Sequence, residues 1–415
     1  MIKLTDCYET EVMRMQFIDG GVTAPQGYFA TGVACGIKKN GEKDLAIICS
    51  EDVAATAGVF TTNKVKGHSL KLTMQRVRDN GYATAIIINS GCANACVGDR
   101  GDADAREIAS KAAELLGCRS DEVLVGSTGV IGKPLDMEKL LAGVEQAVND
   151  MTADGGHDAE LAIMTTDTVP KEVAVEIQIQ GERVVIGGMA KGSGMIHPDM
   201  ATMIAVLTTD ANISKKLLDK AMREVCATTF NRVSVDGDTS VCDMAVIFAN
   251  GLAENDGIVN EDASYRYFCE VLEKVCLFLT KKIAADGEGA TKLIEVQVYG
   301  AKSPEDAYRI CSCIAKSPLV KTAINGCDAN WGRIITAIGY SGADFDPARV
   351  DISINKIRVC RSGAAAIFDE DKIKEQLEKD EIVINVHLNY GECGDRMWTC
   401  DFSEDYVRIN GSYRS

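Results

Sequence analysis

Short runs of hydrophobic residues alternate with stretches of helical periodicity through the first three quarters of the chain. Continuous apolar runs are typical of strands buried on both faces, and apolar residues at every third or fourth position are typical of amphipathic helices. The runs predict core strands at 44–49, 84–88, 123–125, 203–207 and 244–249. The periodicity predicts helices at 102–116, with Asp102 as N-cap, and at 139–151, 214–227 and 261–281. This alternation indicates a mixed α and β core.

A predicted hairpin leads into the most unusual stretch of the sequence. Residues 173–179 alternate apolar and polar side chains, and 184–186 returns as a second strand after a turn at Gly181 and Glu182. The chain then passes through a glycine-rich loop and a His-Pro pair into the apolar strand that follows Thr202. A hydroxyl therefore lies where a loop meets a buried strand. On this pattern alone, Thr202 is also well explained as a threonine that opens a core strand.

The last part of the chain predicts a smaller unit. Residues 295–300 predict a strand that closes the first core. Ser303 and Pro304, followed by two acids, mark a helix start, because the serine caps the first turn and acids favour the positive helix end. The remaining elements are a helix at 330–338 and strands at 350–359 and 382–388. We expect an α+β protein with a core in residues 1–300 and a C-terminal α+β domain in 301–415.

The composition is that of a large globular protein with an acidic surface. The chain has 415 residues, of which 46% are hydrophobic and 25% charged, and its formal net charge is −17. Such a charge opposes binding to nucleic acid or anionic membranes and leaves small polar substrates open. Residues 1–20 lack the apolar core of a secretory signal, and no apolar run reaches the roughly 18 residues of a membrane span. We expect a cytoplasmic protein without nucleic-acid or membrane partners.

The cysteines and histidines do not form a recognisable metal site. Sixteen cysteines are dispersed over the chain, and we expect mostly reduced, buried thiols. The sequence contains no Cys-x-x-Cys pair and no His-x-x-x-His pair to complete a zinc set. The four histidines are isolated from one another, and His197 alone lies in the loop before Thr202. We therefore expect no metal.

Ten motifs, taken in order, give the chain a specific resemblance to one enzyme family. They are GGVTAPQGY (20–28), GVFTTN (58–63), NSGCANA (89–95), GSTGVIG (126–132), TTDT (165–168), KGSGMIHPDMATMIAVLTTDA (191–211), FNRVSVDGDTS (230–240), GEGATK (287–292), DANWGR (328–333) and YVRINGSYRS (406–415). The chain resembles the ornithine acetyltransferases, the glutamate N-acetyltransferases of arginine biosynthesis. The resemblance covers nearly the full length and implies a layered α/β sandwich core. One departure is Val241-Cys242-Asp243, where the family usually has Thr-Asn-Asp.

The resemblance implies that the chain cuts itself between Ala201 and Thr202. The products would be an α chain of residues 1–201 and a β chain that begins at Thr202, assembled as a heterotetramer of two α and two β chains. Thr202 would be the nucleophile. The freed α-amine of Thr202 has an unperturbed pKa of roughly 7.7–8.0, so it can act as the general base for the hydroxyl on the same residue. The small side chain of Ala201 leaves room for that hydroxyl to attack the preceding carbonyl carbon.

The resemblance also assigns an oxyanion hole and a substrate-binding set. Thr128 and Gly129 correspond to the oxyanion hole, where a hydroxyl and an unobstructed glycine N–H converge on the developing charge. The binding set consists of Thr168, Lys191, Thr202, Glu288, Asn410 and Ser415. Lys191 suits the α-carboxylate of an N-acetylated amino acid, and Glu288 suits an ammonium group. Without the resemblance, these residues are typical of turns and ordinary loops.

The implied activity is transfer of the acetyl group from N2-acetyl-L-ornithine to L-glutamate through an ester on Thr202. The resemblance implies no metal and no bound organic cofactor, and some family members also use acetyl-CoA as donor. A second hypothesis is a hydrolase, because the self-cutting architecture also resembles aminopeptidases with an N-terminal nucleophile, in which water replaces glutamate. A third is a non-catalytic amino-acid-binding protein.

The C-terminal tail carries two of the implied binding residues. The alternation of side chains from Tyr406 predicts a short strand, from which Asn410 and Ser415 would reach back to the pocket. The alternative is a frayed terminus, the usual fate of a chain end.

Overall fold

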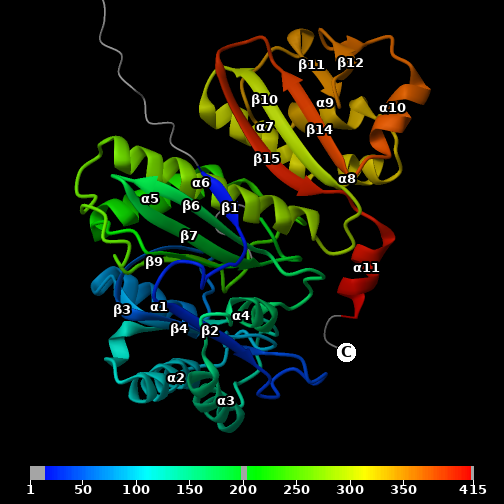
Figure 1. Ribbon diagram of the computed structural model, residues 1–415. Coiled ribbons are helices and arrows are strands. Elements are labelled where there is room, and N and C mark those ends of the chain that lie inside the picture. Colours follow the sequence, from blue (N-terminus) through cyan, green and yellow to red (C-terminus); the bar gives the residue numbers. More distant parts are fainter. Residues whose placement is uncertain (1–14, 198–202, 413–415) are drawn as a thin grey trace, which may run out of the picture.

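The computed structural model describes residues 15–197 and 203–412. Figure 1 shows two sheets, each with its own helices. The larger sheet has nine strands. Its order is β1 (Gln16–Ile18), β6 (Glu172–Ile179), β7 (Glu182–Lys191), β8 (Ile204–Thr209), β9 (Met244–Ala249), β3 (Leu45–Phe60), β4 (Tyr82–Asn89) and β5 (Val123–Ser127), and β2 (Tyr28–Val33) pairs with β3. The core strands predicted from apolar runs are confirmed; β9 has the predicted ends, whereas β3 continues to Phe60, well beyond the predicted 44–49.

The long strand β3 lets the larger sheet form two layers. Its first half pairs with β2 and β4, and its second half pairs with β9, with an irregularity between Cys49 and Ala54. A buried apolar cluster lies between the two layers, with residues such as Ile86 and Ile88 of β4 and Val206 and Val246 of β8 and β9. Burial on both faces explains why these strands read as continuous apolar runs.

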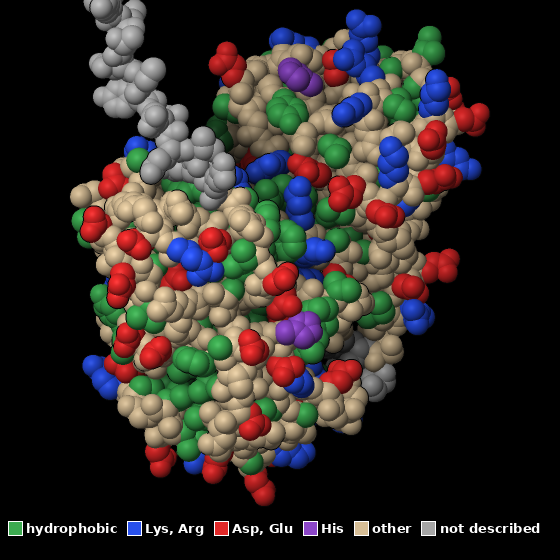
Figure 2. All heavy atoms as spheres, in the orientation of Figure 1, with side chains coloured by type: hydrophobic (Ala, Val, Ile, Leu, Met, Phe, Trp, Pro, Cys, Tyr) green, Lys and Arg blue, Asp and Glu red, His purple; other side chains and the backbone are tan. Residues whose placement is uncertain are grey.

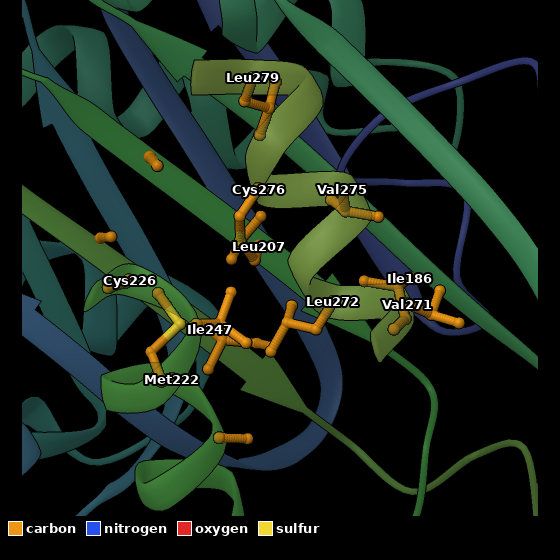
Figure 3. Packing of buried hydrophobic residues seen from close by; sticks show 14 of the residues in the cluster. Ile186, Leu207, Met222, Cys226, Ile247, Val271, Leu272, Val275, Cys276 and Leu279 are labelled. Atoms are coloured by element: carbon orange, nitrogen blue, oxygen red, sulfur yellow. The ribbon is translucent and has the colours of Figure 1, made fainter. Parts of the chain in front are cut away.

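Helices cover the outer face of each layer, as Figure 1 shows. The amphipathic helices α5 (Lys215–Thr228) and α6 (Ala263–Ala285) pack on β6 to β9. Figure 3 shows this packing, in which Val275 and Leu279 of α6 lie beside Leu207 of β8. Helices α2 (Arg100–Leu116) and α3 (Met137–Asp150) cover the other layer, while α1 (His68–Asp79) and α4 (Gly156–Ile163) add residues to the central cluster. The predicted layered α/β sandwich is therefore confirmed.

The second sheet has six strands and a separate apolar core. Its order is β13 (Ala364–Ala365), β12 (Ile357–Arg361), β11 (Asp351–Ile354), β14 (Glu381–His387), β10 (Leu293–Ala301) and β15 (Cys393–Cys400). Its helices are α7 (Pro304–Lys316), α8 (Pro318–Asn325), α9 (Trp331–Gly339) and α10 (Glu370–Leu377). The fully buried Trp398 of β15 belongs to the same cluster as α6, so this side chain joins the two parts.

Several local predictions are confirmed and several need correction. The Ser303 side chain accepts a hydrogen bond from the Asp306 N–H at the start of α7, as predicted. The strand at 295–300 exists as β10, but it pairs with β14 and β15 rather than closing the larger sheet. The stretch 350–359 is a hairpin of two strands, because Asn355 and Lys356 both have positive φ angles.

Two predicted termini differ from the structure for identifiable reasons. Asp102 lies in the first turn of α2 and is not its N-cap, and its carboxylate is instead 2.8 Å from His68 Nδ1. The tail strand is wrong, because Glu404–Gly411 is a helix, α11. Ser403 caps α11 by accepting from the Asp405 N–H, and two acids occupy the first turn. These start signals outweigh a short alternation of side chains. Among the described residues, no helix is long and apolar enough to span a membrane.

Candidate active site

A cavity of about 420 Å³ opens where β8 begins. It brings together five of the residues predicted for the site: Thr128, Gly129, Lys191, Glu288 and Asn410. Their sequence separation reaches almost three hundred residues, so the fold, and not local sequence, assembles them. Ala201, Thr202 and Ser415 lie outside the described residues.

The Thr128–Gly129 pair is fixed by the end of strand β5. The Thr128 N–H donates to the Asn89 carbonyl at 3.0 Å, which continues the pairing of β5 with β4. Gly129 has φ +125°, and a Cβ at this position would come within 2.4 Å of the Gly91 carbonyl carbon. Only glycine fits such a close approach of two backbone segments. The pair therefore presents a hydroxyl and an unobstructed backbone to the cavity.

Lys191 is a buried cation without an ion pair. It is the last residue of β7 and is 3% exposed. Its Nζ lies 3.4 Å from Thr128 Oγ1, and within the described parts of the chain no carboxylate oxygen lies within ion-pair distance. A buried ammonium group without a carboxylate partner is costly, and it is well suited to bind an anionic group that enters the cavity.

The tail helix α11 supplies the opposite wall of the cavity. Asn410 Nδ2 donates to Glu288 Oε2 at 2.7 Å. Glu288 is 5% exposed, and a Cβ on Gly194 would come within 2.3 Å of its carboxylate, so only a glycine allows this contact. Tyr406 of α11 stacks on Phe402, which precedes the helix, with ring centroids 4.7 Å apart, and this contact stabilises the position of the helix. The tail therefore returns to the cavity as a helix.

A buried group of charged side chains, which we call the ion triad (Asp167, Lys171 and Asp286), lies behind the cavity. Lys171 Nζ is 2.7 Å from Asp167 Oδ1 and 2.6 Å from Asp286 Oδ2. The Thr168 N–H and hydroxyl also bond to the Asp286 carboxylate. Thr168 thus contacts the ion triad and is not among the residues that line the cavity, whereas Thr165 and Thr166 of the same motif line it. The sequence analysis missed the ion triad, although Asp167 lies within the TTDT motif.

Asp243 is a further buried acid near the cavity, and it belongs to the Val241-Cys242-Asp243 stretch that departs from the family pattern. It is fully buried, with the Thr61 and Ser240 side chains and the Met203 backbone as polar neighbours. Burial raises the pKa of Asp243 well above its usual range, and the Lys191 ammonium offsets only part of this effect. Its neighbour Cys242 lines the cavity, and burial also raises the pKa of the Cys242 thiol. A protonated thiol is a weak nucleophile.

Asp236 holds residues 195 and 196, which lie just before the predicted cleavage site. Its carboxylate accepts the N–H groups of Met195 at 2.6 Å and Ile196 at 3.0 Å. Met195 has a positive φ of 56°, so the chain turns sharply here. Two residues further on, His197 Nδ1 lies 3.4 Å from Ser234 Oγ. The approach to the predicted cleavage site is therefore fixed by contacts from the segment 230–240.

Comparison with known proteins agrees with the motifs. The model of the ArgJ family matches residues 29–415, and the chain belongs to this family. It is 50% identical over 405 residues to the arginine biosynthesis bifunctional protein ArgJ of Caldanaerobacter subterraneus subsp. tengcongensis, covering 97% of this chain and all of the relative. The ArgJ protein of Symbiobacterium thermophilum is 49% identical, with the same coverage. A crystal structure of ArgJ from Bacillus halodurans, 46% identical, covers 50% of this chain and 97% of its own, with a TM-score of 0.48.

The surface is mixed in charge. Figure 2 shows acidic and basic side chains interspersed on one face of the molecule, without an extended basic area on that face. Within the described residues, no group of three or more histidine, cysteine, aspartate or glutamate side chains is arranged to hold a metal ion.

His197 predicts a specific dependence of stability on pH. Burial, helped by Lys316, lowers the pKa of His197 to about 4. In the unfolded chain the pKa is about 6.5, so the folded state binds fewer protons between these values. The contribution of His197 to stability is therefore complete above pH 6.5 and is lost as the pH falls toward 4. His197→Asn should flatten the fall of the thermal midpoint over this window.

The matched control is His157→Asn, because His157 is exposed beside Glu172. This variant should keep the wild-type pH dependence. If His197→Asn and the wild type lose stability in parallel between pH 6.5 and 4, His197 does not titrate as the burial indicates.

Proposed function

We propose that the chain transfers the acetyl group from N2-acetyl-L-ornithine to L-glutamate in arginine biosynthesis, through an ester on Thr202. The observation that carries this proposal is a cavity in which Thr128 and Gly129, the Glu288 carboxylate and Lys191, a buried cation with no ion pair among the described residues, meet; Lys191 lies opposite Ile204, the first residue of β8. Thr202 is bonded to Met203, the residue just before that strand. Relatives that match over their full length are named arginine biosynthesis bifunctional protein ArgJ.

The proposed reaction uses groups of this chain alone. Cleavage after Ala201 frees the α-amine of Thr202. The Thr202 hydroxyl attacks the acetyl carbonyl carbon, and its proton passes to the α-amine. The Thr128 hydroxyl and the Gly129 N–H donate to the oxyanion. The bond between the acetyl carbon and the ornithine nitrogen then breaks, and the α-amine returns the proton to that nitrogen. The amine of glutamate attacks the Thr202 ester and gives a proton to the α-amine, the bond between the acetyl carbon and the Thr202 oxygen breaks, and the α-amine passes the proton to that oxygen, which restores the hydroxyl.

The charged groups of the cavity suit the two ends of the substrate. We assign the α-carboxylate to Lys191, which has no competing ion pair among the described residues. We assign the side-chain ammonium of acetylornithine to Glu288, which Asn410 holds from the tail helix. Thr168 and Ser415 remain proposed binding residues, the first acting from its place against Asp286.

Several wider features belong to the same proposal. The word bifunctional in the names of the relatives supports acetyl-CoA as a second acetyl donor. We propose a catalytic core in residues 1–300 and a C-terminal domain in 301–415, with β10 as the connecting strand, because the second sheet has its own apolar core. We also propose assembly of two α and two β chains, with neither a metal nor a bound cofactor. We propose that the enzyme works in the cytoplasm.

Cleavage and transfer can be tested together on the purified protein. Purified protein should consist of two chains that separate between Ala201 and Thr202, as measured by intact mass. With acetylornithine and glutamate it should form acetylglutamate and ornithine. Thr202→Ala should remain one chain and should be inactive, because it lacks the hydroxyl for both steps.

Two outcomes would redirect the assignment. Steady release of acetate from acetylornithine without glutamate would identify the enzyme as a hydrolase. Persistence of both fragments in Thr202→Ala would mean that another protease cuts the chain and would refute self-cleavage.

Thr128→Ala should lower the maximal rate of transfer and change substrate affinity little. Loss of one oxyanion donor costs about 2.7–4 kcal/mol, which corresponds to roughly a hundredfold to a thousandfold in rate. Self-cleavage also passes through an oxyanion, so rates must be divided by the amount of cut chain. A change confined to the Michaelis constant would exclude Thr128 from the oxyanion hole.

Asn410→Ala should leave self-cleavage intact and raise the Michaelis constant for acetylornithine. Hydrogen bonds to charged groups contribute roughly 1.5–3 kcal/mol, so we expect about a tenfold rise or more when Glu288 loses this donor. Arg408→Ala on the same helix is the control, because the exposed Arg408 pairs with Asp405 and not with a cavity residue. Equal Michaelis constants for Asn410→Ala and Arg408→Ala would show that the tail does not contribute to binding.

A further inference from the structure

The ion triad is hydrogen-bonded to residues next to Lys191 and is linked through Ser193 to Glu288, the two charged residues of the cavity. Asp167 Oδ1 accepts the N–H of Gly192, the residue after Lys191, at 2.6 Å. The main-chain carbonyl of Asp286 accepts the Ser193 hydroxyl at 2.7 Å. The Ser193 carbonyl in turn accepts the N–H of Glu288 at 3.1 Å. Three segments far apart in sequence, around residues 167–171, 192–193 and 286–288, are therefore held at one place.

Within the ion triad, two carboxylates face one ammonium group, and Lys191 is a second cation that acts on Asp167. Asp167 and Asp286 carry two negative charges, and Lys171 supplies one positive charge at hydrogen-bond distance from both. Lys191 supplies the second. Burial raises the pKa of Asp167, but Lys191 and Lys171 together outweigh this effect and bring it to about 2. Asp167 is therefore ionised and interacts electrostatically with both lysines, although among the described residues only Lys171 forms an ion pair with it.

Lys171 decides where the ammonium of Lys191 can point. Attraction between charges is strong in a buried site, and an unpaired buried carboxylate is costly. If Lys171 lost its charge, Lys191 would be the main cation left to act on Asp167, whose carboxylate already contacts Gly192. The ammonium of Lys191 would then turn from the cavity toward Asp167.

We propose that Lys171 is a positioning residue for substrate binding: by pairing with Asp167 and Asp286, it keeps the Lys191 ammonium free for the α-carboxylate of the substrate. This proposal rests on the proposed function, because it assumes that an amino-acid carboxylate binds in the cavity. Lys171 itself is 1% exposed, is not among the residues that line the cavity, and touches no substrate.

The test compares two substrates that differ only in the group that Lys191 would bind. N2-acetylornithine and its α-carboxamide carry the same acetyl group and side chain, but only the first has a carboxylate. The quantity measured is the ratio of kcat/KM for the acid to kcat/KM for the amide. Lys171→Met removes the charge and keeps a long side chain. It should lower this ratio roughly tenfold or more, since one charge-assisted contact is lost. Rates are divided by the amount of cut chain.

A second variant distinguishes charge from structure. Lys171→Met combined with Asp167→Asn removes the carboxylate that attracts Lys191 and keeps an oxygen for the Gly192 N–H. The ratio should return toward the wild-type value. The control is Asp210→Asn. Asp210 is also a buried charge, and it accepts the Val185 N–H at 2.7 Å at the other end of β8. This variant changes stability without access to the cavity, so its ratio should stay at the wild-type value.

Each outcome decides the proposal. Equal losses for acid and amide in Lys171→Met would mean that Lys171 only supports the fold, and the proposal would be overturned. A double variant that keeps the low ratio would overturn it as well. If Lys171→Met does not fold, the double variant alone is decisive, because the proposal requires its ratio to match the wild type. Absence of transfer in the cut wild-type enzyme would instead refute the proposed function.

Discussion

The burial of β8 on both faces is the constraint on which the site depends. Every residue of Ile204–Thr209 is buried, and the strand is hydrogen-bonded to β7 on one side and β9 on the other. A shift of register by one residue would exchange the two buried faces, so the register is strongly specified. Ile204 consequently lies level with both Lys191 and Met244. The start of this strand is a fixed point at which the ends of its neighbours must meet.

The fold could be predicted where local pattern and final environment agree. The apolar runs of β4, β8 and β9 are continuous because both faces are covered, and the cap at Ser303 needs only its own helix. Which strands pair with each other was harder to predict from the sequence. The strand β10 looks like any half-buried strand, and its assignment to the second sheet depends on β14 and β15, about ninety residues away.

Five of the residues that line the cavity could be predicted from the sequence. The buried ion pairs and the helix that hold them in place could not. Motif resemblance named Thr128, Lys191, Glu288 and Asn410 without any geometric argument, and the structure brings them to one cavity. The ion triad could not be predicted, because Lys171 and Asp286 are 115 residues apart in sequence and neither belongs to a recognisable motif for an ion pair. The tail forms a helix because the capping signals at Ser403 to Asp405 precede the alternation of side chains from Tyr406 and determine the local structure.

The cavity draws its walls from both sides of the Ala201–Thr202 bond. Thr128 and Lys191 precede this bond, whereas Glu288 and Asn410 follow it and come from the opposite end of the chain. Neither product of a cut at that bond holds a complete site. Two fragments expressed from separate genes would each be inert, and activity would report their association. The proposed role of Asn410 also implies that the site is incomplete during synthesis until α11 has been made and has folded against Glu288.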